Sequence, residues 1–208
     1  MFEVAIQTEA FESHGQDRVD AIAHPHGIVL VVADGAGGTS GGAEAADAVL
    51  LATRSYVTHA ADIRDAMQWE QMLAAIDRQI SISGNGQTTA VILAVSEGGL
   101  SGASVGDSAA WLIDEQDGYR DLTAGQIRKP LLGSGASQPV AFEHAWKGGT
   151  LLVATDGLVK YAPPARICEV ARGPDLPTAA RHLIDLVRLR TGALQDDVGV
   201  ALCRMPNR

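Results

Sequence analysis

Cysteine is scarce in this 208-residue chain, which has only Cys168 and Cys203. Neither stands in a C-x-x-C pair or in a Cys/His spacing, so the sequence lacks the usual cysteine motifs of a metal site. We interpret both as reduced, small apolar residues of a cytoplasmic protein, a compartment in which disulfides are rare. A disulfide between the two is the alternative, and nothing in their spacing supports it.

Basic residues and long apolar runs are also few. Lys and Arg number 16 against 25 Asp and Glu, giving a net charge of −9, which argues against a nucleic-acid partner because binding phosphates requires a basic face. The longest apolar run, residues 28–33, is far shorter than the ~20 residues that cross a bilayer. The N-terminal residues lack the basic and apolar regions of a signal peptide. We therefore expect a cytoplasmic protein with no membrane or nucleic-acid partner.

The hydrophobic pattern predicts antiparallel sheets with helices packed outside them. Apolar runs and alternation indicate strands, and apolar residues at helical spacing indicate helices. The expected strands are 2–7, 27–33, 88–95, 100–106, 109–114, 138–145, 150–155 and 198–203, and the expected helices are 42–60, 62–81 and 177–192. Connections 96–99 and 106–108 are short, as in antiparallel hairpins. Strands and helices do not alternate, so we expect an α+β fold, in a single domain over residues 1–208.

Aspartates recur where these predicted strands begin or end. Asp34, Asp107 and Asp156 follow apolar strands, and the pair 196–197 precedes the last one. If these ends converge, the like charges require protonation or a cation between them. Oxygen ligands without cysteine or paired histidine favour Mg²⁺ or Mn²⁺. Two such ions close together activate water and clamp a phosphoryl oxygen, which is the chemistry of phosphoester hydrolysis.

Six motifs, in order, resemble the motif series of the protein phosphatase 2C family of metal-dependent serine/threonine phosphatases. They are GQDRVD (15–20), VVADGAGG (31–38), GQTTAV (86–91), ASVGDSAAWLI (103–113), LLVATDGL (151–158) and QDDVGV (195–200). The resemblance covers most of the chain and is to small bacterial-type members. It implies an α+β, four-layer α-β-β-α sandwich, with two central antiparallel sheets flanked by helices and two Mn²⁺ or Mg²⁺ ions at one end.

The resemblance also assigns roles to individual residues. Asp34 matches the ligand that bridges the two metals, and Gly35 matches the carbonyl ligand beside it. Asp156 and Asp196 match a pair of ligands of the first metal, so Asp34, Asp156 and Asp196 would hold the attacking hydroxide. The other metal positions are matched by Gln16 and Asp17 in the early acidic pair, whose first member reaches the second metal, and by Asp107, which helps to hold a third, weaker metal.

The chain departs from the family pattern at the phosphate-binding position. Glu12 stands where the family usually has a phosphate-gripping arginine. The cations that could replace it are Arg18, Arg128, Lys129 and Lys160, of which we favour Arg18 and Lys160. The segment between residues 122–126 and 151–157 is short, so we expect any substrate-shaping flap to be minimal.

Three further departures affect metal binding and proton transfer. Gln16 is a neutral ligand where the family has an acidic residue, which weakens the second metal site. Lys160 stands where many members carry an aspartate for the third metal, which argues against a third ion. Ala36 stands where some members carry a histidine, so a proton donor is missing there.

The sequence therefore predicts a cytoplasmic signalling enzyme that hydrolyses phosphoserine and phosphothreonine in proteins with water activated by two metal ions. Its expected partners are a phosphorylated protein substrate and a cognate kinase or that kinase's target. Glu12, Gln16 and Lys160 motivate an alternative of another class, a phosphatase-fold regulatory module that binds phosphoproteins with little or no turnover.

Overall fold

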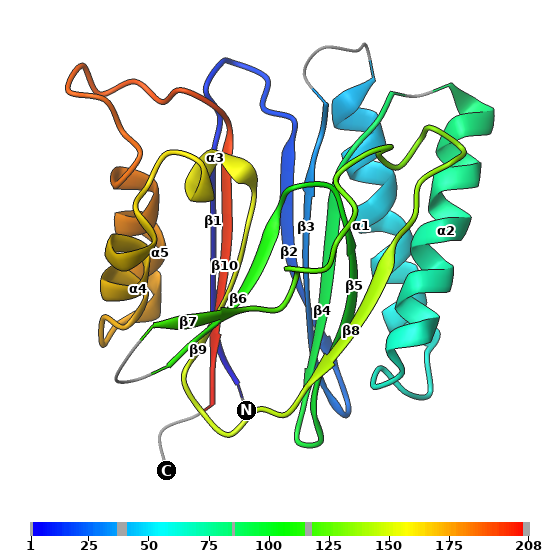
Figure 1. The fold of residues 1–208 in the computed structure, drawn as a ribbon, viewed down its shortest axis with the longest axis horizontal. Helices are drawn as coiled ribbons and strands as arrows, with labels where there is room; N and C mark the ends of the chain where they lie inside the picture. Colours follow the sequence, from blue (N-terminus) through cyan, green and yellow to red (C-terminus); the bar gives the residue numbers. More distant parts are fainter. Residues whose placement is uncertain (1, 37–40, 85, 115–117, 206–208) are drawn as a thin grey trace.

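The chain forms two stacked antiparallel sheets between two layers of helices. The computed structural model describes residues 2–36, 41–84, 86–114 and 118–205 (Figure 1). Within these residues, the first sheet has the order β1 (Glu3–Glu9), β10 (Val198–Arg204), β9 (Thr150–Ala154), β6 (Ala109–Ile113), β7 (Tyr119–Asp121). The second has the order β2 (Asp17–His24), β3 (Gly27–Asp34), β4 (Ala90–Ser96), β5 (Gly99–Val105), β8 (Val140–His144).

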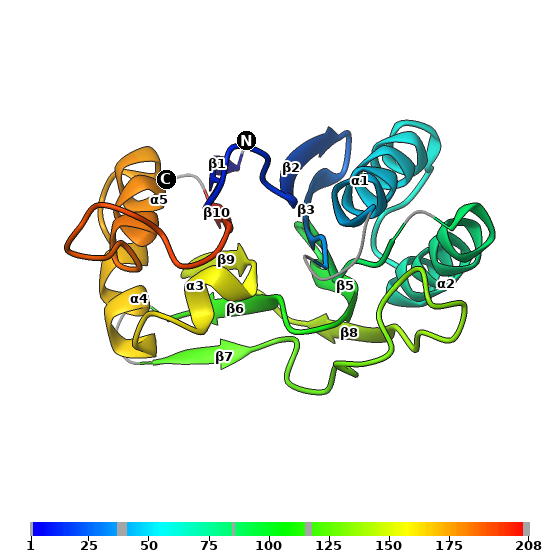
Figure 2. The same ribbon diagram turned by 90° about the horizontal axis from the view of Figure 1, so that it is seen from above.

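The helices cover the outer faces of both sheets, as the view from above shows (Figure 2). The second sheet is covered by α1 (Gly42–His59) and α2 (Ala66–Ser83), the first by α4 (Pro164–Ala171) and α5 (Leu176–Asp185), and the short α3 (Asp156–Val159) follows β9. This arrangement confirms the expected α+β, four-layer sandwich. Nowhere in the described ranges is a helix both long and apolar enough to cross a membrane.

The apolar strand β3 is buried on both of its faces. Val29, Val31 and Ala33 pack in the core beneath α1 and α2. Leu30 and Val32 point the other way, into the core between the two sheets, because successive side chains of a strand alternate in direction. A strand covered on both faces needs apolar residues at every position, which explains the unbroken run that ends at Asp34.

Residues 106–108 connect the two sheets and do not form the hairpin that their short length suggested. β5 belongs to the second sheet and β6 to the first. Gly106 turns the chain with a φ of 106°, a backbone conformation that residues other than glycine rarely adopt. The crossing places Asp107 at the end of the sandwich, between the sheets. Length alone could not distinguish a crossing from a hairpin.

The predicted helix over 177–192 was too long at its C-terminal end. α5 ends at Asp185, and Arg188 lies beyond it. The Arg188 guanidinium instead pairs with the carboxylate of Glu9 on β1, at 2.7 Å. The helix predicted over 62–81 similarly begins late, because Asp65 caps it by accepting a hydrogen bond from the Met67 N–H at 2.9 Å.

A buried carboxylate on α2 fixes the segment that joins β7 to β8. Asp77 is 3% exposed, and its oxygens accept hydrogen bonds from three backbone N–H groups. The donors are Gly133 at 2.7 Å, Gly135 at 3.0 Å and Ser137 at 3.1 Å. Hydrogen bonds to a charged group are stronger than neutral ones, so residues 133–137 are held firmly against the helix.

The two cysteines lie in different cores and are both free. Cys168 packs beneath α4 and α5, and Cys203 packs between the sheets. Burial raises the pKa of the Cys203 thiol to about 12, which keeps it as the unreactive thiol. Both therefore serve as small apolar core residues.

Candidate metal centre

Three of the predicted metal ligands meet at one end of the sandwich. Within the described residues, Asp34, Asp107 and Asp156 each offer a carboxylate oxygen, and these oxygens lie within 4.8 Å of one another. Asp34 ends β3 in the second sheet, Asp156 follows β9 in the first, and Asp107 lies on the crossing between the two. Both sheets therefore contribute to this acidic cluster, the term used below for these three residues.

Hydroxyl groups hold Asp34 in place from the backbone side. The Asp34 N–H donates to Thr89 Oγ1 at 3.0 Å, and the Asp34 carbonyl accepts from Thr88 Oγ1 at 2.8 Å. Thr89 Oγ1 also hydrogen-bonds to Ser108 Oγ at 2.7 Å, next to Asp107. One buried network thus ties together the backbones that carry two of the three carboxylates.

The residues after β9 bring Asp156 against the start of β10. A Cβ added to Gly157 would lie 1.9 Å from the carbonyl oxygen of Asp197. No side chain fits at that distance from a backbone atom, so glycine is required for α3 to approach β10. The glycine after Asp156 therefore sets the distance between Asp156 and the pair Asp196–Asp197.

Asp197 fastens the connection between β1 and β2. Its carboxylate accepts hydrogen bonds from the backbone N–H of Phe11 at 2.7 Å and of Gln16 at 2.5 Å. This role explains an acidic residue at position 197 without metal binding. It also positions the start of β2, where Asp17 stands opposite Asp34 in the strand register.

Burial and like charge raise the pKa values of the clustered carboxyls. The pKa of Asp34 rises to about 9, first because burial disfavours the charged form and then because Asp17, Asp156 and Asp107 are negative. Burial also raises the pKa of Asp17 to about 7, against an opposing hydrogen bond from Thr155. The pKa of Asp156 is raised by burial and by Asp107. A group of carboxyls with raised pKa values is suited to binding a cation, because the cation would stabilise their ionised forms.

Lys160 places a positive charge beside this cluster. It lies one helical turn after Asp156, and its Nζ is 3.7 Å from Asp156 Oδ2 and 3.9 Å from Asp196 Oδ2. The ammonium partly offsets the rise in the pKa of Asp156. Lys160 is thus the predicted phosphate-binding residue that the structure brings to the site.

Arg18 lies in different surroundings. Its guanidinium pairs with Asp47 on α1 at 2.6 Å and donates to the carbonyls of Gly15 and Asp17 at 2.8 and 3.0 Å. These bonds engage most of its donors in holding β2 to α1. Arg128 and Lys129, the other two cations considered, are exposed on the segment between β7 and β8.

The remaining predicted ligands surround the cluster without joining it. Asp17 and Asp196 contribute no oxygen to the group of described carboxylates within 4.8 Å. The amide oxygen of Gln16 is buried against Gly42 and has no hydrogen-bond partner among the residues that the structure describes. A Cβ added to Gly35 would lie 2.5 Å from the backbone of Gly42, so Gly35 packs closely against it. Ligand roles for Gln16, Asp17, Gly35 and Asp196 stay predictions, as do those of the three residues in the cluster. Residues 37 and 38 of the motif VVADGAGG (31–38) lie outside the described residues.

Sequence reasoning missed the supporting residues behind the ligands. Thr88, Thr89 and Ser108 lie within two of the quoted motifs, yet no role was predicted for their hydroxyls. The pattern that could have indicated this role is the presence of three hydroxyl residues at the ends of otherwise apolar strands. The backbone contacts of Asp197 had no comparable signal, because its partners are 181 and 186 residues away in sequence.

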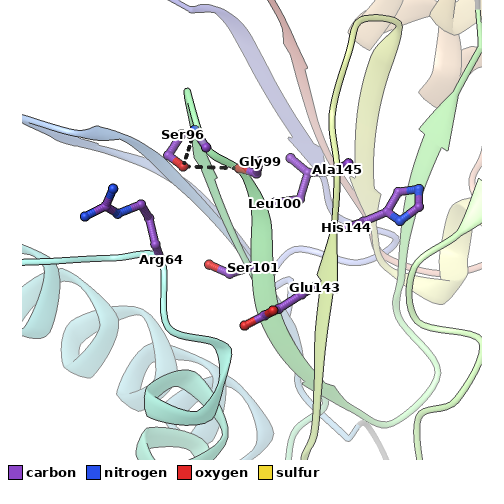
Figure 3. A pocket seen from close by; sticks show the side chains of 9 residues that line it. Arg64, Ser96, Gly99, Leu100, Ser101, Glu143, His144 and Ala145 are labelled. Atoms are coloured by element: carbon purple, nitrogen blue, oxygen red, sulfur yellow. Dashed lines mark hydrogen bonds between the residues drawn. The ribbon is translucent and has the colours of Figure 1, made fainter.

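A separate pocket of about 390 Å³ lies at the turn between β4 and β5, away from the acidic cluster; Figure 3 shows its lining side chains. Arg64, Ser101 and Glu143 line it beside the turn between β4 and β5. Arg64 is paired with Asp62 at 2.7 Å, and Ser101 Oγ donates to the carbonyl of Ile63 at 3.0 Å. The side chains of Arg64 and Ser101 are thus already engaged within the protein, and the acidic cluster remains the candidate for chemistry.

The fold of the sandwich is similar to that of several solved bacterial serine/threonine phosphatases. Stp1 from Staphylococcus aureus is 20% identical with a TM-score of 0.86, over 100% of this chain and 96% of that one. PstP/Ppp from Mycobacterium tuberculosis is 19% identical with a TM-score of 0.85, over 99% of each chain. The catalytic domain of PstP in complex with two manganese ions is 19% identical with a TM-score of 0.84, again over 99% of each.

The family follows from the sequence match. The family model described as protein phosphatase 2C matches residues 9–172, and the chain belongs to this family. A search of curated proteins gives no match. The family match confirms the resemblance drawn from the six motifs.

Proposed function

We propose that this chain hydrolyses phosphoserine and phosphothreonine in proteins, using water activated by two Mn²⁺ or Mg²⁺ ions. The observation that carries the proposal is the convergence of Asp34, Asp107 and Asp156 within 4.8 Å. Family membership and the two manganese ions in the PstP structure support it. A bound divalent ion supplies Lewis acidity, which activates water and neutralises phosphoryl charge.

The chain's own residues would bind and orient the reacting groups. Asp34, Asp107 and Asp156 would hold the ions, together with Asp196, Asp17, Gln16 and the Gly35 carbonyl at the edge. The hydroxyl network of Thr88 and Thr89 keeps Asp34 in place during the reaction. Ala36 carries no proton donor in its side chain, so the leaving alkoxide takes its proton from water.

Metal-dependent turnover tests this function. With Mn²⁺, the purified protein should hydrolyse p-nitrophenyl phosphate and a phosphothreonine peptide. EDTA should abolish both activities, and excess Mn²⁺ should restore them, because the acidic cluster is the source of the chemistry. Turnover that persists after complete chelation would contradict the proposal.

Lys160 is the residue that we propose binds a phosphoryl oxygen in place of the missing family arginine. Its ammonium lies between Asp156 and Asp196, where the substrate phosphate would approach. Replacing Lys160 by methionine should raise KM for p-nitrophenyl phosphate about tenfold, the effect of losing one charge-assisted hydrogen bond of about 1.4 kcal/mol. Affinity for Mn²⁺, measured by calorimetry, should not fall, because the competing cation is removed.

The matched control for this variant is Lys147→Met, which removes an exposed lysine on the connection between β8 and β9. It should leave KM unchanged. An unchanged KM in Lys160→Met as well would show that Lys160 serves only as a local counter-ion.

The second candidate function is a phosphoprotein-binding module with little turnover. Lys160 beside two predicted ligands and the neutral Gln16 favour it, since both weaken metal binding. Calorimetry distinguishes the two functions. Two Mn²⁺ sites with turnover support the enzyme, whereas one site or none, with phosphopeptide binding and no turnover, supports the module.

A further inference from the structure

The segment between β7 and β8 is fastened on both sides of a short cationic stretch. Before the stretch, the carbonyl of Ile127 accepts a hydrogen bond from the Gly106 N–H at 3.0 Å. After it, Leu132 exchanges two backbone hydrogen bonds with Thr88, both at 3.1 Å, and the loop then reaches the three bonds to Asp77. Residues 128–131 are thus held at both ends by ordered backbone.

Both fastenings lie next to residues of the acidic cluster. Gly106 directly precedes Asp107, and Thr88 donates its hydroxyl to the carbonyl of Asp34 at 2.8 Å. In Figure 1 the segment passes β4 and β5 and continues toward the upper end of α2. Its position relative to the cluster is therefore set by the backbone that also positions Asp34 and Asp107.

Two adjacent cations on this stretch face solvent. Arg128 and Lys129 are exposed, and neither makes an ion pair or hydrogen bond with any residue in the described ranges. By contrast, Arg18, Arg54 and Arg188 all pair with carboxylates. In a chain of net charge −9, these two neighbouring cations are available to a ligand, and the ends of their stretch are bonded to backbone next to Asp107 and Asp34.

We propose that Arg128 and Lys129 form a specificity site that binds acidic side chains flanking the phosphorylated residue of a protein substrate. The proposal rests on the proposed phosphatase function and names the substrate class. In an extended peptide, a residue two or three positions from the phosphorylated one lies about 7–10 Å away from it. The side chains of such flanking residues would therefore contact residues outside the cluster. Carboxylates on the flanking residues of the substrate would pair with the Arg128 guanidinium and the Lys129 ammonium. This attraction would offset the repulsion between those carboxylates and the acidic cluster.

Steady-state kinetics with three substrates test this site. The substrates are a phosphothreonine peptide with Asp and Glu on both sides, the same peptide with Lys flanks, and p-nitrophenyl phosphate. In the double variant R128Q/K129Q, KM for the acidic peptide should rise about three- to tenfold with kcat unchanged, since exposed ion pairs are individually weak. KM for p-nitrophenyl phosphate should stay the same, because it has no flanking residues.

The dependence on salt gives a second readout. The advantage of the acidic peptide over the lysine-flanked one in the unmodified protein should shrink as ionic strength rises, because exposed charges are screened. In R128Q/K129Q, the difference between the two peptides should depend little on ionic strength. The control R120Q/K147Q removes two other exposed cations that lie on β7 and on the β8–β9 connection, and it should behave like the unmodified protein.

The outcomes separate this proposal from the proposed function. Equal KM values for the acidic peptide in R128Q/K129Q and the unmodified protein overturn the specificity site, as does an equal loss in the control variant. If no form of the protein turns over p-nitrophenyl phosphate with Mn²⁺, the phosphatase function has failed. In that case, fluorescence anisotropy with labelled forms of the same peptides tests the specificity site. The site requires that the acidic peptide bind more weakly to R128Q/K129Q than to the unmodified protein.

Discussion

Replacing Asp34 by asparagine should lower kcat at least about a thousandfold and at the same time stabilise the metal-free protein. A thousandfold loss corresponds to about 4 kcal/mol of transition-state stabilisation, which is the scale of effect expected when a central metal ligand is lost. The gain in stability follows from the raised pKa of Asp34 to about 9, because a buried carboxyl beside like charges opposes folding. We expect a gain on the order of 1 kcal/mol, as at other strained functional sites.

Two measurements on the same variant check this expectation. Turnover of p-nitrophenyl phosphate with Mn²⁺ gives the change in kcat, and urea unfolding in EDTA gives the change in free energy of unfolding. Asp185→Asn, which removes an exposed carboxylate at the end of α5, is the control and should keep full activity. Loss of activity with loss of stability would indicate a structural role for Asp34, and retained activity would exclude it as a ligand.

The second large effect concerns pH. The metal-free protein should lose stability steadily as pH rises from about 4 to about 9. Asp34 and Asp17 have ordinary pKa values of 3.8 that the fold raises to about 9 and about 7. Between these limits the folded protein keeps protons that the unfolded chain has released, so raising the pH favours unfolding. A bound cation should remove this penalty, because it stabilises the ionised carboxylates.

Thermal unfolding at pH 5, 6, 7 and 8 measures the effect. In EDTA, Tm should fall across the series, and saturating Mn²⁺ should raise Tm by more at pH 8 than at pH 5. The fall should be shallower in Asp34→Asn, which has lost the group with the higher pKa. A Tm in EDTA that is constant or rises with pH would contradict the raised pKa values.

Much of the fold could be predicted because its central strands carry strong local signals. The runs that became β3, β4 and β10 are apolar at nearly every position, since the cores on both sides exclude water. β2 was missed because its side chains are mostly only partly buried, so its sequence shows neither a clear alternation nor an apolar run. α4, with eight residues, is too short to display a helical stripe.

The convergence of Asp34 and Asp156 could be predicted from the sequence, because each stands in a motif that coincides with a strand end. Asp107 was predicted to converge with these two and to help to hold a third, weaker metal, and its carboxylate lies within 4.8 Å of theirs. The route by which it gets there, the crossing between the sheets, is not revealed by any local pattern. The contacts of Asp77 with Gly133 and Gly135 were likewise unpredictable, because they join residues 56 and 58 positions apart.

The crossing at residues 106–108 has a mechanical consequence. The two sheets touch mainly through apolar side chains, which resist separation but do little to oppose sliding of one sheet over the other. Asp34 belongs to one sheet and Asp156 to the other, with Asp107 between them. An ion held by all three would link the two sheets and oppose the sliding of one over the other. Metal loading should therefore slow hydrogen exchange in β3 and β9 together, so that the two halves of the sandwich open as a single unit.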